Sequence, residues 1–369
     1  MFINLASFLV FYCIISPLNY KLTAQNLYII KNPKPTCEEN LYTELMKVGE
    51  LSETIEDENF LIKPTSMVAD KEGNIFVYDR RHAKIFKYDK NLKLIKTFGR
   101  KGQGPGEFGV FSQGGGNIFL YISKDDFLYV GDRFNLRIHC FDLDGNLIRD
   151  VKIRTGGLPS IVPVEDSKKN IYLYSEDMNG GIIDVFNQKG EKTESLLSRK
   201  ELRYGLFFMP DSSNKELYLY SDPYTIQYDI FEDDKLIICS LNSGFLYILK
   251  DNRLLKKLPL WPKKALAMYK KKLKNAIKDG LIVSYFFRLI PDKDNEKYFY
   301  LNFGKPLDSE RTLLYKFDVE GRLKEVLFIK EDKNQHTKVL YKKNNLFYAI
   351  GTNEEDEKTI ILYKEGNKR

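Results

Sequence analysis

The chain has 369 residues, of which 43% are apolar, 30% charged and 14% aromatic, so it is neither a disordered nor a low-complexity polypeptide. With 24 Tyr and 25 Phe against a single Trp, its composition favours β-strands over helices. The net charge is +7, but acidic and basic residues are interspersed, which indicates a soluble surface and points only weakly to a polyanionic partner.

The N-terminal segment predicts export. The first twenty residues contain no charged side chain, and the run Leu5–Ile15 is almost entirely apolar. Small and polar residues follow it, which is typical of a secretory signal peptide cleaved near Ala24 or Gln25. Because no Lys or Arg precedes the apolar run, an uncleaved membrane anchor is the alternative. We therefore expect residues 1–25 to be a signal peptide or an anchor, and residues 26–369 to form a single domain.

Two copies of one repeat follow, at residues 67–98 and 121–151. Asp79-Arg80 of the first copy aligns with Asp132-Arg133 of the second, at an offset of 53 residues. Each copy predicts four short strands joined by polar turns. The resulting antiparallel sheet has two apolar faces, so neighbouring sheets must pack on it.

Looser copies occupy residues 161–197, 227–260, 286–330 and 336–365. The last copy lacks its fourth strand, whereas the strand-like stretch at residues 41–51 belongs to no copy. Because a ring of sheets must remove its open edges, we expect this N-terminal strand to complete the last sheet and close the ring. The predicted fold is all-β, a six-bladed β-propeller of four-stranded antiparallel blades. Residues 206–220 fit no unit and leave open an extra strand pair or a seventh blade.

One segment, at about residues 262–280, breaks the β pattern. Its apolar residues recur every fourth position among lysines, with Pro262 at the start and Gly280 at the end, which predicts an inserted amphipathic helix. We expect its apolar stripe to pack on the propeller. The alternative is a basic surface for anionic lipid or a partner protein.

Three cysteines remain after cleavage near Ala24: Cys37, Cys140 and Cys239. An odd number cannot form a closed disulfide framework, and their separations match no metal-ligand spacing. Because Cys140 and Cys239 lie in strand-like runs, we expect them to be small buried residues.

A glycine-rich segment separates the first two repeats. It lacks the G-x-G-x-x-G and P-loop spacings, and no helix follows it, so it does not predict a nucleotide site. Between two sheets we expect it to be a structural inter-blade connection. The residues of this connection are Phe98, Gly99, Gly102, Gly104, Pro105, Gly106, Glu107 and Phe108.

The pattern D-x-x-G-N-I-F-V-x-D-R-x-x-x-K-I-x-x-Y-D, followed by F-G-x-x-G-x-G-P-G-E-F, resembles the NHL-repeat propellers, particularly the bacterial exported six-bladed type. The resemblance is specific over residues 67–154, degenerate over 161–330 and weak beyond. It implies a propeller with a central channel and a ligand or partner bound on one face. Related propellers include lyases whose histidines hold a metal near the channel, and forms that bind nucleic acid.

Neither of these activities transfers readily to this chain. His82, His139 and His336 show no metal-ligand spacing, so no metal site is predicted. No catalytic Ser/His/Asp or paired-carboxylate signature is present, and the catalytic residues stay unknown. Export removes nucleic acid as a partner.

The residues that follow the second strand of the first two repeats are the candidate ligand-binding rim, because Arg binds carboxylates and phosphates in a bidentate manner. The alternative is that each Asp caps its own loop and each Arg pairs locally between blades. The members of this rim are Asp79, Arg80, Arg81, His82, Asp132 and Arg133.

The sequence therefore predicts an exported, non-enzymatic binding or protein-interaction scaffold, monomeric, and periplasmic, extracellular or envelope-associated. Its partner would be a protein, peptide or glycan of the cell envelope, with membrane contact only if residues 1–25 remain as an anchor. The alternative is a metal-dependent lyase or hydrolase acting at the channel mouth. No cofactor is predicted, although a metal ion at the channel mouth stays open.

Overall fold

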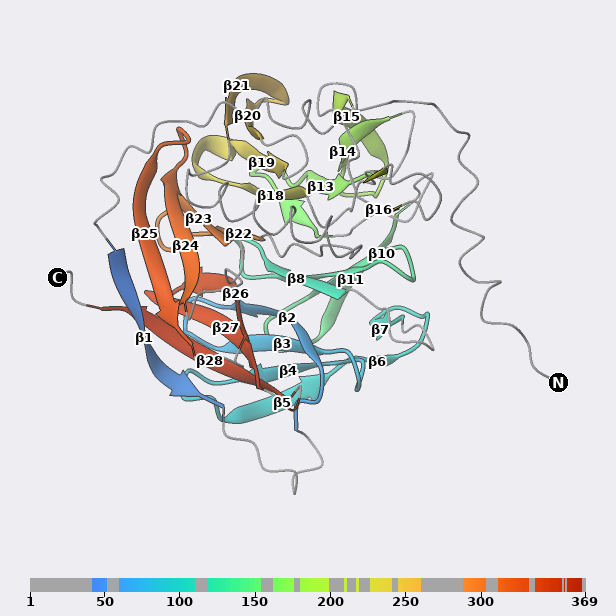
Figure 1. Cartoon of the computed structure of the whole chain (residues 1–369). Coiled ribbons are helices and arrows are strands. Elements are labelled where there is room, and N and C mark those ends of the chain that lie inside the picture. Colours follow the sequence, from blue (N-terminus) through green and yellow to red (C-terminus); the bar gives the residue numbers. More distant parts are fainter. Residues whose placement is uncertain are drawn as a thin grey trace. The chain divides into compact units, whose positions relative to one another are not determined.

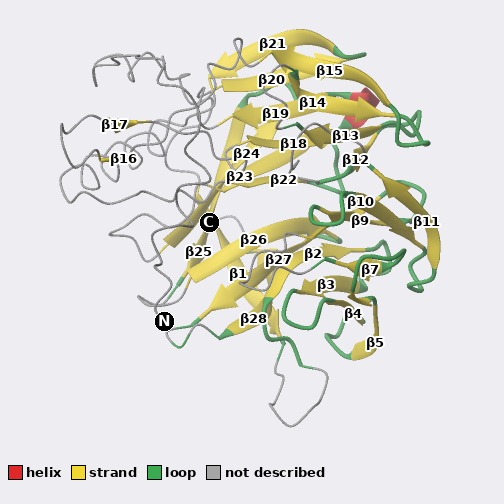
Figure 2. Cartoon of the chain, turned by 90° about the vertical axis from the view of Figure 1, so that its right-hand side faces the viewer, coloured by secondary structure: helices red, strands yellow, loops and turns green. Residues whose placement is uncertain are grey.

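Short strands and polar turns make up the described part of the chain in a computed structural model (Figure 1). The helical element within this part is a single 3-10 turn, Glu232–Asp234 (η5), as Figure 2 shows. The strands belong to one compact unit, Asn32–Arg369. The structure describes residues 42–51, 60–109, 118–153, 162–175, 180–198, 209–210, 217–218, 226–240, 245–259, 288–302, 311–331, 336–353, 355 and 357–366.

Some predicted features lie outside these ranges: the signal peptide or anchor at residues 1–25, the amphipathic helix at about 262–280, and Cys37. Among the described residues, no helix is long and apolar enough to cross a membrane.

Four sheets of four strands and one sheet of eight strands lie in the described ranges, and the eight-stranded sheet contains two blades; this confirms the predicted all-β fold of antiparallel blades. Blade one contains β2 (Pro64–Ala69), β3 (Ile75–Asp79), β4 (Lys84–Tyr88) and β5 (Leu94–Phe98). Blade two contains β8 (Ile118–Ile122), β9 (Leu128–Asp132), β10 (Arg137–Phe141) and β11 (Leu147–Lys152). Blade three contains β12 (Val164–Glu165), β13 (Ile171–Tyr174), β14 (Gly181–Phe186) and β15 (Lys192–Ser198).

The second half of the chain continues the same order. Blade four contains β18 (Ile226–Ile230), β19 (Leu236–Ser240), β20 (Phe245–Lys250) and β21 (Arg253–Pro259). Blade five contains β22 (Arg288–Pro291), β23 (Tyr298–Asn302), β24 (Arg311–Asp318) and β25 (Leu323–Lys330). Blade six contains β26 (His336–Lys343), β27 (Leu346–Thr352), β28 (Lys358–Glu365) and the N-terminal strand β1 (Tyr42–Glu50).

Two short pairs lie outside the blades. Within residues 206–220, β16 (Met209–Pro210) pairs with β17 (Leu217–Tyr218), so this stretch contributes a strand pair. Between blades one and two, β6 (Arg100–Lys101) runs parallel to β7 (Glu107–Phe108).

Strand β1 supplies the fourth strand of blade six. It pairs antiparallel with β28, with Leu45 opposite Glu365 and Glu50 opposite Ile361. On its other side it runs parallel to β25, with Tyr42 opposite Val326, so blades five and six form one continuous sheet. Figure 1 shows the blue N-terminal strand beside the red strands of the C-terminus. This pairing covers the edge that β28 would otherwise expose.

The first strands of the blades form an inner ring. Strand β2 contacts β8 and β26, β22 contacts β18 and β26, and β12 contacts β18. Because these strands surround the propeller axis, the turns that follow them gather at one mouth of the central channel.

The same side-chain hydrogen bond recurs in several of the turns between strands. In three of them an Asp carboxylate accepts a hydrogen bond from the backbone N–H of an Asn four residues later, at 2.8 Å in each case. Such side-chain bonds replace backbone partners inside a tight turn and fix the hairpin. The pairs are Asp70 and Asn74, Asp142 and Asn146, and Asp166 and Asn170.

Aromatic rings fill the spaces between blades. Phe98 of blade one lies 5.4 Å from Phe141 of blade two between ring centroids, and Tyr300 of blade five lies 5.0 Å from Phe347 of blade six. These contacts explain why the chain is rich in Tyr and Phe, since each blade has two faces to bury.

Cys140 and Cys239 are free and buried, which confirms the expectation that they are small buried residues.

Candidate functional site

The two aspartates of the predicted rim end the second strands of blades one and two, and both are fully buried. The Asp79 carboxylate accepts backbone N–H bonds of 2.5 to 3.0 Å from Ile62, Lys63, Arg81 and His82. The Asp132 carboxylate accepts bonds of 2.7 to 3.1 Å from Gly109, Phe134 and Asn135. Each carboxylate therefore caps its own loop and ties it to the segment that enters the same blade.

The remaining rim residues are less buried. Arg81 is exposed, whereas Arg80 and Arg133 are half-buried. The His82 Nδ1 lies 3.1 Å from Asp79 Oδ1. The structure thus brings Asp79 and His82 together within one loop, while the corresponding residues of blade two form a separate loop. Ligand binding at this rim stays a prediction.

The glycine-rich connection is folded on itself. The Glu107 carboxylate accepts bonds from the backbone N–H of Gly104 at 2.9 Å and from the Arg100 side chain at 2.8 Å, and these two groups lower its pKa. Gly99 has a φ of +82° and packs against the fully buried ring of Phe108. Because the carboxylate is satisfied within the loop, this arrangement is that of a connection between blades.

The three histidines lie at three different places. His139 is fully buried in β10, with Nδ1 2.7 Å from Asp150 Oδ1, and it packs on Phe108. His82 belongs to the loop after β3, and His336 is exposed at the start of β26. Across the described ranges, no group of three or more His, Cys, Asp or Glu is arranged to hold a metal ion.

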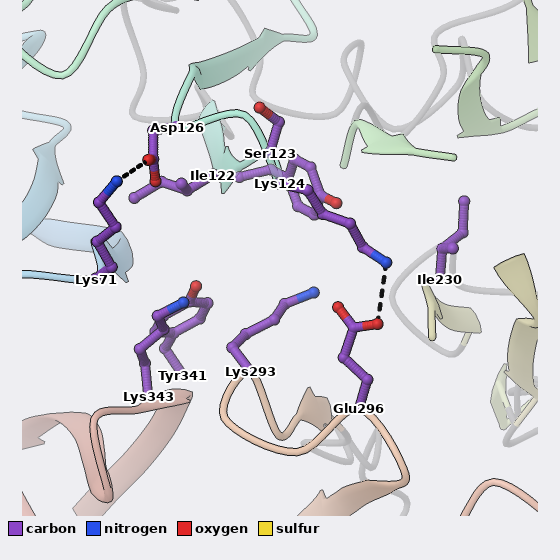
Figure 3. A pocket seen from close by; sticks show the side chains of 11 residues that line it. Lys71, Ile122, Ser123, Lys124, Asp126, Ile230, Lys293, Glu296, Tyr341 and Lys343 are labelled. Carbon is purple, nitrogen blue, oxygen red and sulfur yellow. Dashed lines mark hydrogen bonds and ion pairs between the residues drawn. The ribbon is translucent and has the colours of Figure 1, made fainter. Parts of the chain in front are cut away.

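A cavity of about 250 Å³ opens at the channel mouth (Figure 3). Its lining residues come from the ends of the first strands, or from the turns after them, in blades one, two, four, five and six. Lys71 of this lining lies in the turn that leads into β3, whereas Asp79 ends the same strand. The cavity is therefore at the opposite end of the blades from the predicted rim.

Charged side chains dominate this cavity, which we call the channel-mouth pocket. Its charged lining residues are Lys71, Lys124, Lys293, Lys343, Asp126 and Glu296. The Lys71 ammonium donates to Asp126 at 2.6 Å, and this carboxylate raises the pKa of Lys71. The Lys124 ammonium donates to Glu296 at 3.0 Å; Figure 3 shows both contacts as dashed lines.

The Lys124–Glu296 pair spans the channel mouth. Lys124 belongs to blade two and Glu296 to blade five, which are three places apart in a ring of six and therefore lie opposite each other. Both side chains are partly exposed, at 50% and 33%. This pair forms a bar across the entrance to the channel.

A more buried pair joins blade five to blade four, through Lys293 of the pocket lining. The Lys293 ammonium contacts both carboxylate oxygens of Asp229 at 3.2 Å and lies 5.2 Å from the centre of the Tyr121 ring. Burial raises the pKa of Asp229, against the opposing effect of Lys293. Burial also raises the pKa of Tyr121 and of Tyr341. Like any tyrosine, both are protonated at neutral pH and can act as hydrogen-bond donors.

Sequence reasoning missed the channel-mouth pocket. Its signal was present, because Lys71, Lys124 and Lys293 each follow the first strand of a repeat by one or two residues. Alignment of these first turns would have found a lysine in blades one, two and five. The Asp-Arg pair at the end of the second strand is the better-matched feature of the first two repeats, and it lies at the other end of the blade.

Comparison with known proteins agrees with this architecture. Residues 51–201 match a family model (DUF5128) described as a 6-bladed beta-propeller. The fold is a six-bladed β-propeller. No match was found among curated proteins.

Solved structures similar to this propeller include a member of the DUF4221 family from Bacteroides vulgatus, with a TM-score of 0.55 and 12% identity over 88% of this chain and 99% of that one. A Bacteroides fragilis protein described as exported has a TM-score of 0.51 and 10% identity, over 89% and 96% of the two chains. Virginiamycin B lyase from Staphylococcus aureus has a TM-score of 0.46 and 10% identity, over 87% and 99%. At these identities the likeness shows the fold alone.

Proposed function

We propose that this protein is an exported, monomeric binding protein without catalytic activity, which holds a component of the cell envelope at the channel mouth of its propeller. The observation that carries this function is the channel-mouth pocket, because five blades contribute its lining from separate turns. Pockets where several repeats converge are common ligand sites in repeat folds. The size of about 250 Å³ suits a small molecule or the end group of a larger one.

Two further features of the chain support the proposal. The apolar N-terminal run is typical of a signal peptide, and one structurally similar Bacteroides protein is described as exported. The Asp-Arg repeat and the glycine-rich connection match the NHL pattern, in which the propeller presents ligands or partners on one face. We therefore assign the repeats to the NHL-like type.

Ligand retention tests the binding function. The purified mature protein is incubated with an extract of the producing cell's envelope, separated by gel filtration, and the retained compounds are identified by mass spectrometry. Ile122→Trp places a bulky ring in the pocket, whereas Ile148→Trp makes the same change on the outer strand of the same blade, at a residue that is 56% exposed. The wild type and Ile148→Trp should retain a compound that Ile122→Trp loses.

Retention of the same compound by all three proteins would place binding elsewhere, and retention by none would contradict the binding function. Stoichiometric zinc or calcium in the purified protein would instead favour the metal-dependent lyase or hydrolase.

Export is tested by N-terminal sequencing of the secreted or periplasmic material. We expect a chain that begins near Gln25, whereas an intact N-terminus in the membrane fraction would indicate an anchor.

A further inference from the structure

The charges of the channel-mouth pocket do not balance. Three of its four lysines are paired: Lys71 with Asp126, Lys124 with Glu296, and Lys293 with Asp229. The side chain of the fourth, Lys343, makes no ion pair or hydrogen bond with any residue of the described ranges. The lining itself therefore has four ammonium groups against two carboxylates, and a cleft with an excess of one sign attracts ligands of the opposite sign.

The neighbouring carboxylates of blade five lie outside the lining of the pocket. Asp292 and Asp294 flank Lys293 in the sequence, but both bind the buried Lys342 ammonium at 2.9 Å. Asp294 also accepts the backbone N–H groups of Asn344 and Asn345, at 2.7 and 2.8 Å. These two carboxylates are committed to the turns of blades five and six and do not line the cavity.

The uncharged polar groups of the pocket also suit an anion. Tyr341 lines it with a protonated phenol, which can donate a hydrogen bond to a carboxylate or phosphate. The carboxylates in the lining, Asp126 and Glu296, already accept bonds from lysines. The cavity therefore offers mainly donors to an incoming group.

The bar across the mouth can open at little cost. Lys124 and Glu296 are partly exposed, and exposed ion pairs of this kind contribute little to stability. An anion that replaces the Glu296 carboxylate at Lys124 restores the pairing of that lysine in a cavity that Lys293 and Lys343 also line. Glu296 thus occupies the place that an external carboxylate or phosphate would take.

We infer that the channel-mouth pocket binds an anionic group, a carboxylate or a phosphate, through Lys124, Lys293 and Lys343, and that Glu296 is its internal competitor. This inference rests on the proposed binding function and assigns the class of ligand. The anion enters as Glu296 leaves Lys124, so the bar is an entrance that ligand binding opens.

Calorimetric titration with inorganic phosphate, and separately with citrate, tests this assignment at low ionic strength. Loss of one ammonium contact in Lys343→Gln should weaken the binding of the preferred anion about tenfold. Glu296→Gln should strengthen it about threefold, because the competing charge is gone. Lys364→Gln, an exposed lysine of β28 in the same blade as Lys343, should leave the affinity unchanged. Comparison of the two anions separates phosphate from carboxylate ligands.

The two variants should change the anion affinity in opposite directions: Lys343→Gln should lower it and Glu296→Gln should raise it. Equal affinities in Lys343→Gln and Lys364→Gln, or weaker binding in Glu296→Gln, would overturn the assignment. If Ile122→Trp loses a neutral or cationic envelope compound that the wild type retains, the anion assignment is wrong but the binding function stands. If the wild type retains no compound and binds neither anion, both are wrong.

Discussion

Asp79 and Asp132 occupy equivalent positions at the ends of β3 and β9, and each carboxylate joins the loop that follows its strand to the segment that enters the same blade. In blade one the entering segment is Ile62-Lys63, and in blade two it is Gly109. The best-matched residue of the repeat is thus a buried carboxylate that fixes two pieces of backbone.

Asp132→Asn should destabilise the protein by about 3 kcal/mol at neutral pH, because an amide cannot accept all the N–H bonds that the carboxylate accepts. Burial alone would raise the pKa of Asp132. His139, whose Nε2 lies 3.9 Å away, and the N–H groups of Gly109 and Asn135 outweigh this effect and hold the pKa below its usual 3.8.

This shift gives the loss a defined pH dependence. A carboxyl whose pKa is lower in the folded state stabilises the fold above its unfolded pKa, and this contribution disappears as the pH falls through the folded value. In urea unfolding, the difference between wild type and Asp132→Asn should therefore shrink as the pH falls below about 4. A difference that stays constant from pH 7 to pH 3 would contradict the shift.

Gly99→Ala should cost about 3 kcal/mol in urea unfolding. Its φ of +82° is unfavourable for any residue with a Cβ, and the added atom would overlap the Phe108 ring. Gly106→Ala is the matched variant, because it also has a positive φ, of +72°, but its Cβ would lie 3.6 Å from the nearest atom, on Leu147. We expect it to lose only about 1 kcal/mol. Equal losses would show that the Phe108 contact is unimportant.

Strand β1 offers a test of the junction between blades five and six. Leu45 is 3% exposed between these blades, whereas its neighbour Met46 is 52% exposed. Leu45→Ala should lower the free energy of unfolding by about 2–4 kcal/mol. Met46→Ala should change it by about 0.5 kcal/mol or less. Similar values for the two variants would mean that the strand contributes little to closing the last sheet.

Removing the Lys124–Glu296 ion pair at the channel mouth should have little effect on the stability of the fold. Glu296→Ala removes an exposed partner of Lys124 and should cost less than about 1 kcal/mol. Asp292→Ala, in the same turn between β22 and β23, removes a buried partner of the buried Lys342 and should cost about 3 kcal/mol. Thermal unfolding of the two variants checks this contrast. A large loss in Glu296→Ala would make the bar a structural element.

Local patterns explain why the blades were predictable. The first repeat forms four short strands, as predicted, because strand alternation and turn chemistry depend on residues close in the sequence. Asp79, expected to follow the second strand, is its last residue. The buried state of Cys140 followed from its strand-like surroundings in the same way.

The role of the rim aspartates could not be predicted from such local patterns. The Asp-Arg pairs were visible as a repeat, but the sequence left open whether the carboxylates face a ligand or their own loops. That choice depends on where Ile62, Lys63 and Gly109 bring their N–H groups, which is decided when the entering segments pack on the blades.

The sequence by itself determined the all-β blades, their order and the unpaired strand at the N-terminus, since each depends on short-range periodicity and on turn residues. The tertiary structure was needed to show that β1 also runs parallel to β25, and that Lys124 meets Glu296 across the channel mouth. These partners are far apart in the chain, and no local preference selects them. They meet because the packing of successive blades brings the first turns around one axis, so the pocket is a property of the assembled ring.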